Sequence, residues 1–323
     1  MKISRKSAIV GVALCALFLG AATAQTRKTI AIGTGGTGGV YYPLGGALAN
    51  VLSKYMPDVQ ATAEVTGGSV DNLKLIASGQ SEIAFSMADA ALDAFNGQDK
   101  FKYSGSVPLR TLMILYPNRM HVVTIEGTGI DKIADLKGKR VSTGAPGSAT
   151  EVMAFRLIEA VGLDKDKDLR RERLSVAESV NAIKDRKIDA FFWVGGIPTA
   201  GVTDLGATPG TKLKLVDHAD AVPAMNAKYD NLYVKDTIRA GSYPGQDKDN
   251  AVATVWNILV TDEKIADDFA YAVVKLIFDK KPELVAVHRE AESFVLDTQK
   301  KDNSPIPFHP GAIKYFKEKG LNF

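Results

Sequence analysis

A strand, a glycine-rich loop and a helix follow one another directly in residues 28–55, and this order constrains the fold most. The apolar segment 29–32 predicts a strand, and the loop Gly33-Thr34-Gly35-Gly36-Thr37-Gly38-Gly39 follows it. The residues after the loop have helical spacing, with apolar positions at Leu44, Ala47, Leu48, Val51, Leu52 and Tyr55. Glycines let a backbone approach a ligand, and the free N–H groups of a helix start attract an anion. The segment therefore predicts half of an anion-binding site or, as the alternative, a tight turn without a ligand.

The first 24 residues have the pattern of a secretory signal peptide. Lys2, Arg5 and Lys6 precede an apolar run, which ends at Ala22-Thr23-Ala24. The run is too short for a membrane span, so we expect cleavage after Ala24 and export to the periplasm. The chain's one cysteine is Cys15, within this run. The mature protein is therefore expected to lack disulfides and thiolate chemistry.

Charge and histidine spacing argue against several functional classes. Without the leader, the 40 basic residues become 37, which equals the 37 acidic residues. A neutral chain lacks the basic surface that nucleic-acid binding needs. The four histidines show no metal-ligand spacing, no G-x-S-x-G motif occurs, and no pair of catalytic carboxylates is evident. We therefore expect no metal, no catalytic residues and no nucleic-acid partner.

The order of strand, loop and helix occurs twice, in residues 28–96 and again in 139–199. Alternating strands and helices predict parallel sheets with covered faces, and two such units predict two α/β lobes. Chain crossings near 117–121 and 235–250 would form a hinge if the tail returns to the first lobe. We therefore expect lobe 1 in residues 25–118 and 245–323, and lobe 2 in 119–244.

Several individual elements are specific enough to be checked. Residues 109–116 and 121–125 are expected to be two strands around Pro117-Asn118. The sequences Ser148-Ala149-Thr150-Glu151 and Ser175-Val176-Ala177-Glu178 predict capping boxes at helix starts. Residues 262–279 are expected to form an amphipathic helix, and Pro282 to start another that runs toward Leu296.

The loop at 33–38 also matches the dinucleotide motif G-x-G-x-x-G between a strand and a helix. Glu64 lies further along the chain than the acidic residue of that motif usually does. Nothing downstream supplies an acid or base for hydride transfer, and an exported protein has no access to nicotinamide cofactors. We therefore expect no cofactor.

A binding site uses the features that are present. Both lobes offer a strand end that leads into a helix start, at Gly38–Tyr41 and Gly147–Thr150, and ligands in such folds lie beyond the carboxyl ends of strands. Ser69 and Ser148 are alternatively helix caps, and Tyr41, Met87 and Trp193 alternatively core residues. The candidate ligand-binding residues are Gly38, Gly39, Val40, Tyr41, Ser69, Ser86, Met87, Asp89, Gly147, Ser148, Ala149, Thr150, Trp193 and Gly195.

Residues 32–45, Ile-Gly-Thr-Gly-Gly-Thr-Gly-Gly-Val-Tyr-Tyr-Pro-Leu-Gly, strongly resemble the opening of the TAXI family, the substrate-binding proteins of tripartite ATP-independent periplasmic (TRAP) transporters. Further matches are Gly68-Ser69-Val70, residues 135–141, Pro146-Gly147-Ser148, Val194-Gly195-Gly196 and residues 309–312. The resemblance implies a monomeric receptor with a type II periplasmic-binding-protein fold, in which each lobe is a mixed sheet flanked by helices. It implies glutamate-like or 2-oxoglutarate-like ligands and TRAP membrane subunits as partners. An exported enzyme and a stand-alone sensory receptor are the alternatives.

One departure from the TAXI pattern bears on the ligand. Relatives often have Gln-Ser-Asp after the third strand, where this chain has Met87-Ala88-Asp89. The change removes an amide and a hydroxyl that would bond a polar ligand in a closed cleft. We therefore expect a ligand with fewer polar groups at that end than glutamate.

Overall fold

The computed structural model describes residues 27–323. The signal peptide expected at 1–24 lies outside the described residues. Within 27–323, no helix is long and apolar enough to cross a membrane.

Strands and helices alternate along most of the chain, as the sequence predicts. The first part contains β1 (Lys28–Gly33), α1 (Tyr41–Tyr55), β2 (Val59–Glu64), α2 (Ser69–Ala77), β3 (Ile83–Met87), α3 (Ala88–Asn96) and β4 (Leu109–Ile125). The second contains β5 (Arg140–Ser142), α4 (Ala149–Ala160), β6 (Arg170–Glu172), α5 (Val176–Lys184), β7 (Ala190–Gly195), α6 (Ala200–Gly206), β8 (Leu213–Leu215), α7 (Val222–Asn226) and β9 (Val234–Ile238). The last contains β10 (Asn250–Asp262), α8 (Asp267–Asp279), α9 (Lys281–Val285) and α10 (Pro310–Glu318).

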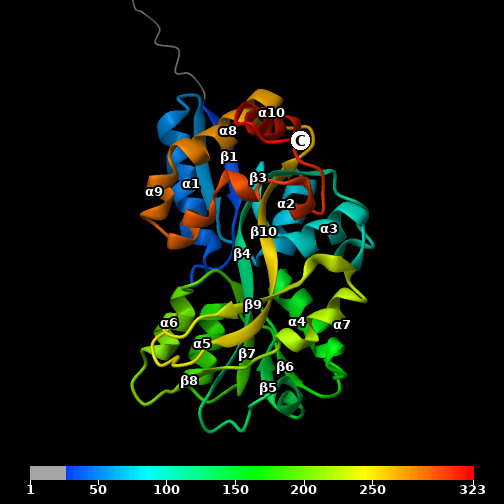
Figure 1. The fold of residues 1–323 in the computed structure, drawn as a ribbon, viewed down its shortest axis with the longest axis vertical. Coiled ribbons are helices and arrows are strands. Elements are labelled where there is room, and N and C mark those ends of the chain that lie inside the picture. The colour runs from blue at the N-terminus through cyan, green and yellow to red at the C-terminus, as the bar shows by residue number, and fades with distance from the viewer. Residues whose placement is uncertain (1–26) are drawn as a thin grey trace, which may run out of the picture.

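Two long strands, β4 and β10, run through both halves of the molecule (Figure 1). They form the centre of a ten-stranded sheet with the order β2-β1-β3-β10-β4-β7-β5-β6, and β8 and β9 pair with β4 and β10. The outer strands are parallel, whereas β10 is antiparallel to β3, β4 and β9. Helices α1–α3 and α8–α10 surround one half, and α4–α7 surround the other (Figure 1). The fold is thus α/β with two halves that share one continuous mixed sheet.

The prediction of two strands around Pro117 was wrong, because β4 is a single strand. Its pairing with β10 shifts between the pairs Trp256–Pro117 and Ile258–Ile114, which leaves two β4 residues opposite Asn257. This is a β-bulge. A proline lacks the N–H that a regular ladder needs, and it is tolerated in strands at such interruptions.

The tail returns to the first half of the molecule. The Thr111 N–H donates to the Pro307 carbonyl at 2.9 Å, and Thr111 forms a parallel bridge with Phe308. Helix α8 begins later than predicted because β10 continues to Asp262. Helix α9 stops at Val285, and a 3₁₀ helix at Arg289–Ser293 (η5) replaces the predicted continuation toward Leu296.

The two predicted capping boxes differ in outcome. At α5, the Ser175 hydroxyl accepts from the Glu178 N–H at 3.3 Å and the Glu178 carboxylate accepts from the Ser175 N–H at 2.8 Å, which confirms the box. At α4, Ser148 caps the helix, but the Glu151 carboxylate bonds Arg173 at 2.6 Å instead. The arginine is a charged donor, so it binds this buried carboxylate in place of the backbone N–H.

We expect Ser175→Ala to lower the free energy of unfolding by about 1 kcal/mol, because the helix loses its cap. Ser175→Gly is the matched control, since glycine is also a good N-cap and costs only a few tenths of that amount. Urea denaturation of the three proteins measures both differences. Equal losses in the two variants would contradict a capping role for the hydroxyl.

Candidate functional site

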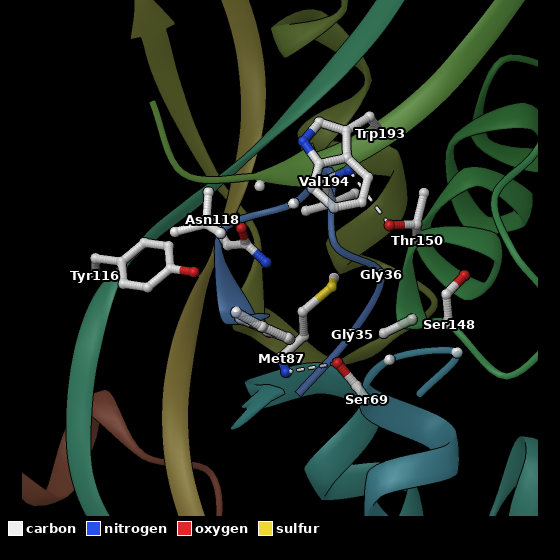
Figure 2. Close-up of a pocket in the computed structure, with 17 residues that line it drawn as sticks. Gly35, Gly36, Ser69, Met87, Tyr116, Asn118, Ser148, Thr150, Trp193 and Val194 are labelled. Atoms are coloured by element: carbon white, nitrogen blue, oxygen red, sulfur yellow. Dashed lines mark hydrogen bonds between the residues drawn. The ribbon is translucent and has the colours of Figure 1, made fainter. Parts of the chain in front are cut away.

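A cavity lies where the two halves of the molecule meet (Figure 2). Loops and helix starts of both halves form its walls, together with residues of β3, β4 and β7. The lining residues are Gly35, Gly36, Gly39, Val40, Tyr41, Gly67, Gly68, Ser69, Met87, Tyr116, Asn118, Ser148, Ala149, Thr150, Trp193, Val194 and Gly195. Its volume is about 50 Å³. One water needs roughly 10–15 Å³ on the same measure, so this conformation admits a ligand of only a few heavy atoms.

Three helices begin at this cavity. Helices α1 and α2 start after Val40 and Gly68 without a side-chain cap, and α4 starts after Ser148. The first N–H groups of a helix have no acceptor within the helix, and the helix dipole adds partial positive charge there. Two helix starts come from one half and the third from the other. The arrangement can therefore hold an anionic group by backbone N–H groups from both halves.

Among the described residues, 27–323, no charged side chain lines this cavity. Several polar side chains that line it already bond to the protein. The Ser69 hydroxyl accepts from the Met87 N–H at 3.1 Å. The Thr150 hydroxyl accepts from the Val194 N–H at 3.3 Å. These bonds fix the positions of the walls and leave the backbone as the source of positive potential.

Two aromatic side chains of the lining are also held in place. The Trp193 indole N–H donates to the Thr199 hydroxyl at 2.8 Å, which orients the ring over the cavity. The Tyr41 hydroxyl donates to the Asn257 side-chain oxygen. Burial raises the pKa of Tyr41, so its hydroxyl remains protonated at neutral pH.

Two lining residues on β4, Tyr116 and Asn118, were not among the candidates from the sequence. The Tyr116 hydroxyl and the Asn118 Oδ1 are buried without a hydrogen-bond partner in the described part of the chain. Burial raises the pKa of Tyr116 well above its ordinary value, so the hydroxyl stays protonated. The signal that could have found them is an asparagine directly after the apolar residues 112–117.

Ten of the fourteen candidate residues lie in the cavity wall. They are Gly39, Val40, Tyr41, Ser69, Met87, Ser148, Ala149, Thr150, Trp193 and Gly195. The other four are outside this wall, and their contacts are with the protein. The Ser86 hydroxyl, for instance, donates to the Met87 carbonyl at 2.9 Å.

Gly38 and Gly147 contact the opposite half of the molecule instead of the cavity. The Gly38 carbonyl accepts from the Gly201 N–H at 3.3 Å, and the Gly147 carbonyl accepts from the Asp71 N–H at 3.0 Å. A Cβ at Gly38 would lie 3.2 Å from the Ala177 Cβ. These glycines therefore allow the two halves to approach closely.

Asp89 belongs to a buried cluster beside the cavity. Its carboxylate accepts from the Tyr233 hydroxyl at 2.8 Å and lies 3.7 Å from Arg156 Nη1. Arg156 also bonds Asp93 at 2.5 Å and the Tyr233 oxygen at 2.9 Å. Asp89 and Asp93 are on α3, whereas Arg156 is on α4. The cluster therefore joins the two halves of the molecule.

The same cluster changes the acidity of its carboxyl groups. Burial, reinforced by Asp89 and Asp99, raises the pKa of Asp93 to about 7 despite the opposing charge of Arg156. Burial also raises the pKa of Asp89, and again Arg156 opposes it. No group of three or more His, Cys, Asp or Glu side chains in residues 27–323 could hold a metal ion.

Comparison with known proteins places this geometry in a family. Residues 32–320 match the NMT1-like family. A solved protein of Bordetella bronchiseptica RB50 is similar over 90% of this chain and 89% of its own, with 17% identity and a TM-score of 0.52. Tv2483 bound to L-arginine is similar over 84% of this chain and 91% of its own length, with 11% identity and a TM-score of 0.50. The alkanesulfonate-binding protein SsuA from Xanthomonas axonopodis pv. citri, bound to MOPS, is similar over 91% of this chain and 80% of its own length, with 16% identity and a TM-score of 0.48.

At these identities the solved structures define the fold, which is the α/β fold of type II periplasmic binding proteins. The family match extends over nearly all of the described residues. The chain therefore belongs to the NMT1-like family.

Proposed function

We propose that this protein is a periplasmic receptor that captures a small organic carboxylate between its two lobes and delivers it to a TRAP membrane permease. The observation that carries the proposal is the meeting of three helix starts at one small cavity without charged side chains. Backbone N–H groups and helix dipoles are sufficient to bind an anion in such a place. The TAXI-like residues 32–45 form one of these helix starts, which supports the TRAP assignment.

In this proposal the lobes close on the ligand by a hinge motion. Lobe 1 comprises residues 25–118 and 245–323, and lobe 2 comprises 119–244. The bonds from Gly38 to Gly201 and from Gly147 to Asp71 cross between the lobes, so they would form on closure. In this proposal the protein acts as a carrier, because the cavity offers helix starts whose backbone N–H groups can bind an anion.

A thermal-shift screen tests the capture of a carboxylate. We expect at least one short carboxylate, among lactate, pyruvate, succinate, 2-oxoglutarate and glutamate, to raise the melting temperature, because a ligand that binds only the folded state stabilises it. The matching primary amide keeps the shape without the charge and should give no shift. Equal shifts for the acid and its amide, or no shift for any acid, would contradict the proposal.

Delivery to a permease needs a separate test. Uptake of the ligand into proteoliposomes that contain TRAP membrane subunits from the same organism should require this protein in the external solution. Uptake at the same rate without the protein would contradict the role in delivery and leave ligand capture intact.

A further inference from the structure

The β4 wall of the cavity carries polar atoms that no other part of the described chain satisfies. Tyr116 and Asn118 are 0% and 1% exposed, and the Tyr116 hydroxyl and Asn118 Oδ1 have no hydrogen-bond partner. Asn257 Nδ2, on the neighbouring strand β10, is also unpaired. An unpaired buried polar group costs about 1–3 kcal/mol, and such exceptions call for an explanation. Because two of these residues line the cavity, a bound ligand provides that explanation.

The backbone aims these side chains into the cavity. The shift of pairing between Trp256–Pro117 and Ile258–Ile114 places Tyr116 in the β-bulge. Bulges of this kind redirect side chains beside binding sites. Figure 2 shows the Tyr116 hydroxyl and the Asn118 amide on the β4 side of the pocket, with the Asn118 nitrogen nearer to the middle of the pocket than its oxygen.

The chemistry of the free atoms restricts what they can bind. Asn118 Oδ1 is an acceptor and needs a donor from the ligand, whereas the Tyr116 hydroxyl can donate to a ligand oxygen. A hydroxyl satisfies both, since it donates and accepts at one oxygen. A keto oxygen only accepts. An ammonium group would donate, but a buried ammonium needs a carboxylate, and the lining contains none.

We propose, building on the proposed function, that the ligand is a short hydroxycarboxylate whose hydroxyl bonds Tyr116 and Asn118 while its carboxylate lies at the starts of α1, α2 and α4. A cavity of about 50 Å³ matches a molecule with few heavy atoms. The apolar Met87 covers the side of the cavity between these two subsites, where a second charged group would have no partner (Figure 2). An α-amino acid such as glutamate is therefore a poor ligand.

Four molecules of similar size test this assignment by isothermal titration calorimetry. Lactate has both groups, propionate lacks the hydroxyl, alanine has an ammonium in its place, and lactamide lacks the charge. Glycolate and 2- and 3-hydroxybutyrate extend the series in length. We expect the best hydroxycarboxylate to bind at least about tenfold more tightly than its deoxy analogue, because the analogue leaves two polar groups unpaired.

The variant Tyr116→Phe should reduce this preference toward equal affinity for lactate and propionate, with propionate affinity unchanged. The hydroxyl that it removes has no partner in the described chain, so the variant should remain as stable as the wild type. Tyr55→Phe is the matched control. Its hydroxyl donates to the Glu283 carboxylate at 2.6 Å at the last residue of α1, one helix length from the cavity, so the control should keep the preference.

The outcomes separate the two proposals. Tighter binding of alanine or propionate than of every hydroxycarboxylate, or an unchanged preference in Tyr116→Phe, overturns the hydroxycarboxylate assignment and leaves carboxylate capture standing. Binding of none of these acids and of none of the acids in the thermal-shift screen overturns both.

Discussion

Arg156→Leu is expected to lower the free energy of unfolding by about 3–5 kcal/mol at pH 8, the cost of removing one partner from a buried ionic cluster. Arg156 is the cation that faces Asp89 and Asp93 at 3.7 and 2.5 Å, and it is 5% exposed. Without it, two buried carboxylates lose the cation that faces them. Urea denaturation measures the loss.

The matched control is Arg239→Leu, which breaks the ion pair with Asp249 on the surface. Exposed pairs contribute about 0–1 kcal/mol, so this variant should be nearly as stable as the wild type. Equal losses in the two variants would contradict the importance of the buried cluster.

The effect of Arg156→Leu should also depend on pH. The pKa of Asp93 is raised to about 7, so between about pH 4 and 7 the folded protein binds more protons at this group than the unfolded chain does. The stability contributed by this protonation is complete below about pH 4 and is lost as the pH rises through about 7. At pH 5 the carboxyl groups can therefore become neutral, and the loss in Arg156→Leu should be smaller than at pH 8. A larger loss at pH 5 would contradict the raised pKa.

Gly68→Val is expected to weaken ligand binding by about 100-fold. Gly68 has φ +120° and ψ −153°, a region that only glycine occupies easily, so valine brings about 1–3 kcal/mol of strain. A Cβ there would already be in van der Waals contact with the Ser148 Cα of the opposite lobe, at 3.4 Å, so the two methyl groups of valine would press against that lobe. The substitution therefore displaces the start of α2 and keeps it from the start of α4. A 100-fold loss of affinity corresponds to about 2.8 kcal/mol of binding free energy.

Gly79→Val provides the control at the other end of α2. Gly79 also has a positive φ, +70°, but a Cβ there meets nothing within 4 Å. The control should lose comparable stability and bind the ligand as the wild type does. Isothermal titration calorimetry measures the affinity of both variants for the carboxylate that gives the largest thermal shift. Equal affinities in the two variants would contradict the role of the α2 start.

The order of the elements was predictable because it depends on local patterns. The helical spacing from Leu44 to Tyr55 and the Ser175 capping box are properties of adjacent residues, and both were confirmed. The continuity of β4 was not predictable, since Pro117 normally interrupts a strand. Only the partner strand β10, distant in the sequence, shows that the interruption is a bulge.

The site was predictable where it depends on helix starts and not where it depends on packing between lobes. Gly38 approaches the opposite lobe, whereas its neighbour Gly39 lines the cavity, and the sequence does not distinguish the two. Asp89 follows the end of a strand, which is a position typical of ligand-binding residues. The sequence does not show that Arg156, on a distant helix, faces its carboxylate. Tyr116 directly follows the apolar run Leu112–Leu115 and therefore has the pattern of a core residue.

A crystal structure of the protein with its carboxylate bound tests the central claim most directly. We expect the carboxylate oxygens to lie within about 2.7–3.2 Å of backbone N–H groups at the start of α4 and at the start of α1 or α2. A carboxylate that contacts the helix starts of only one lobe, or that binds outside the cavity, would contradict it.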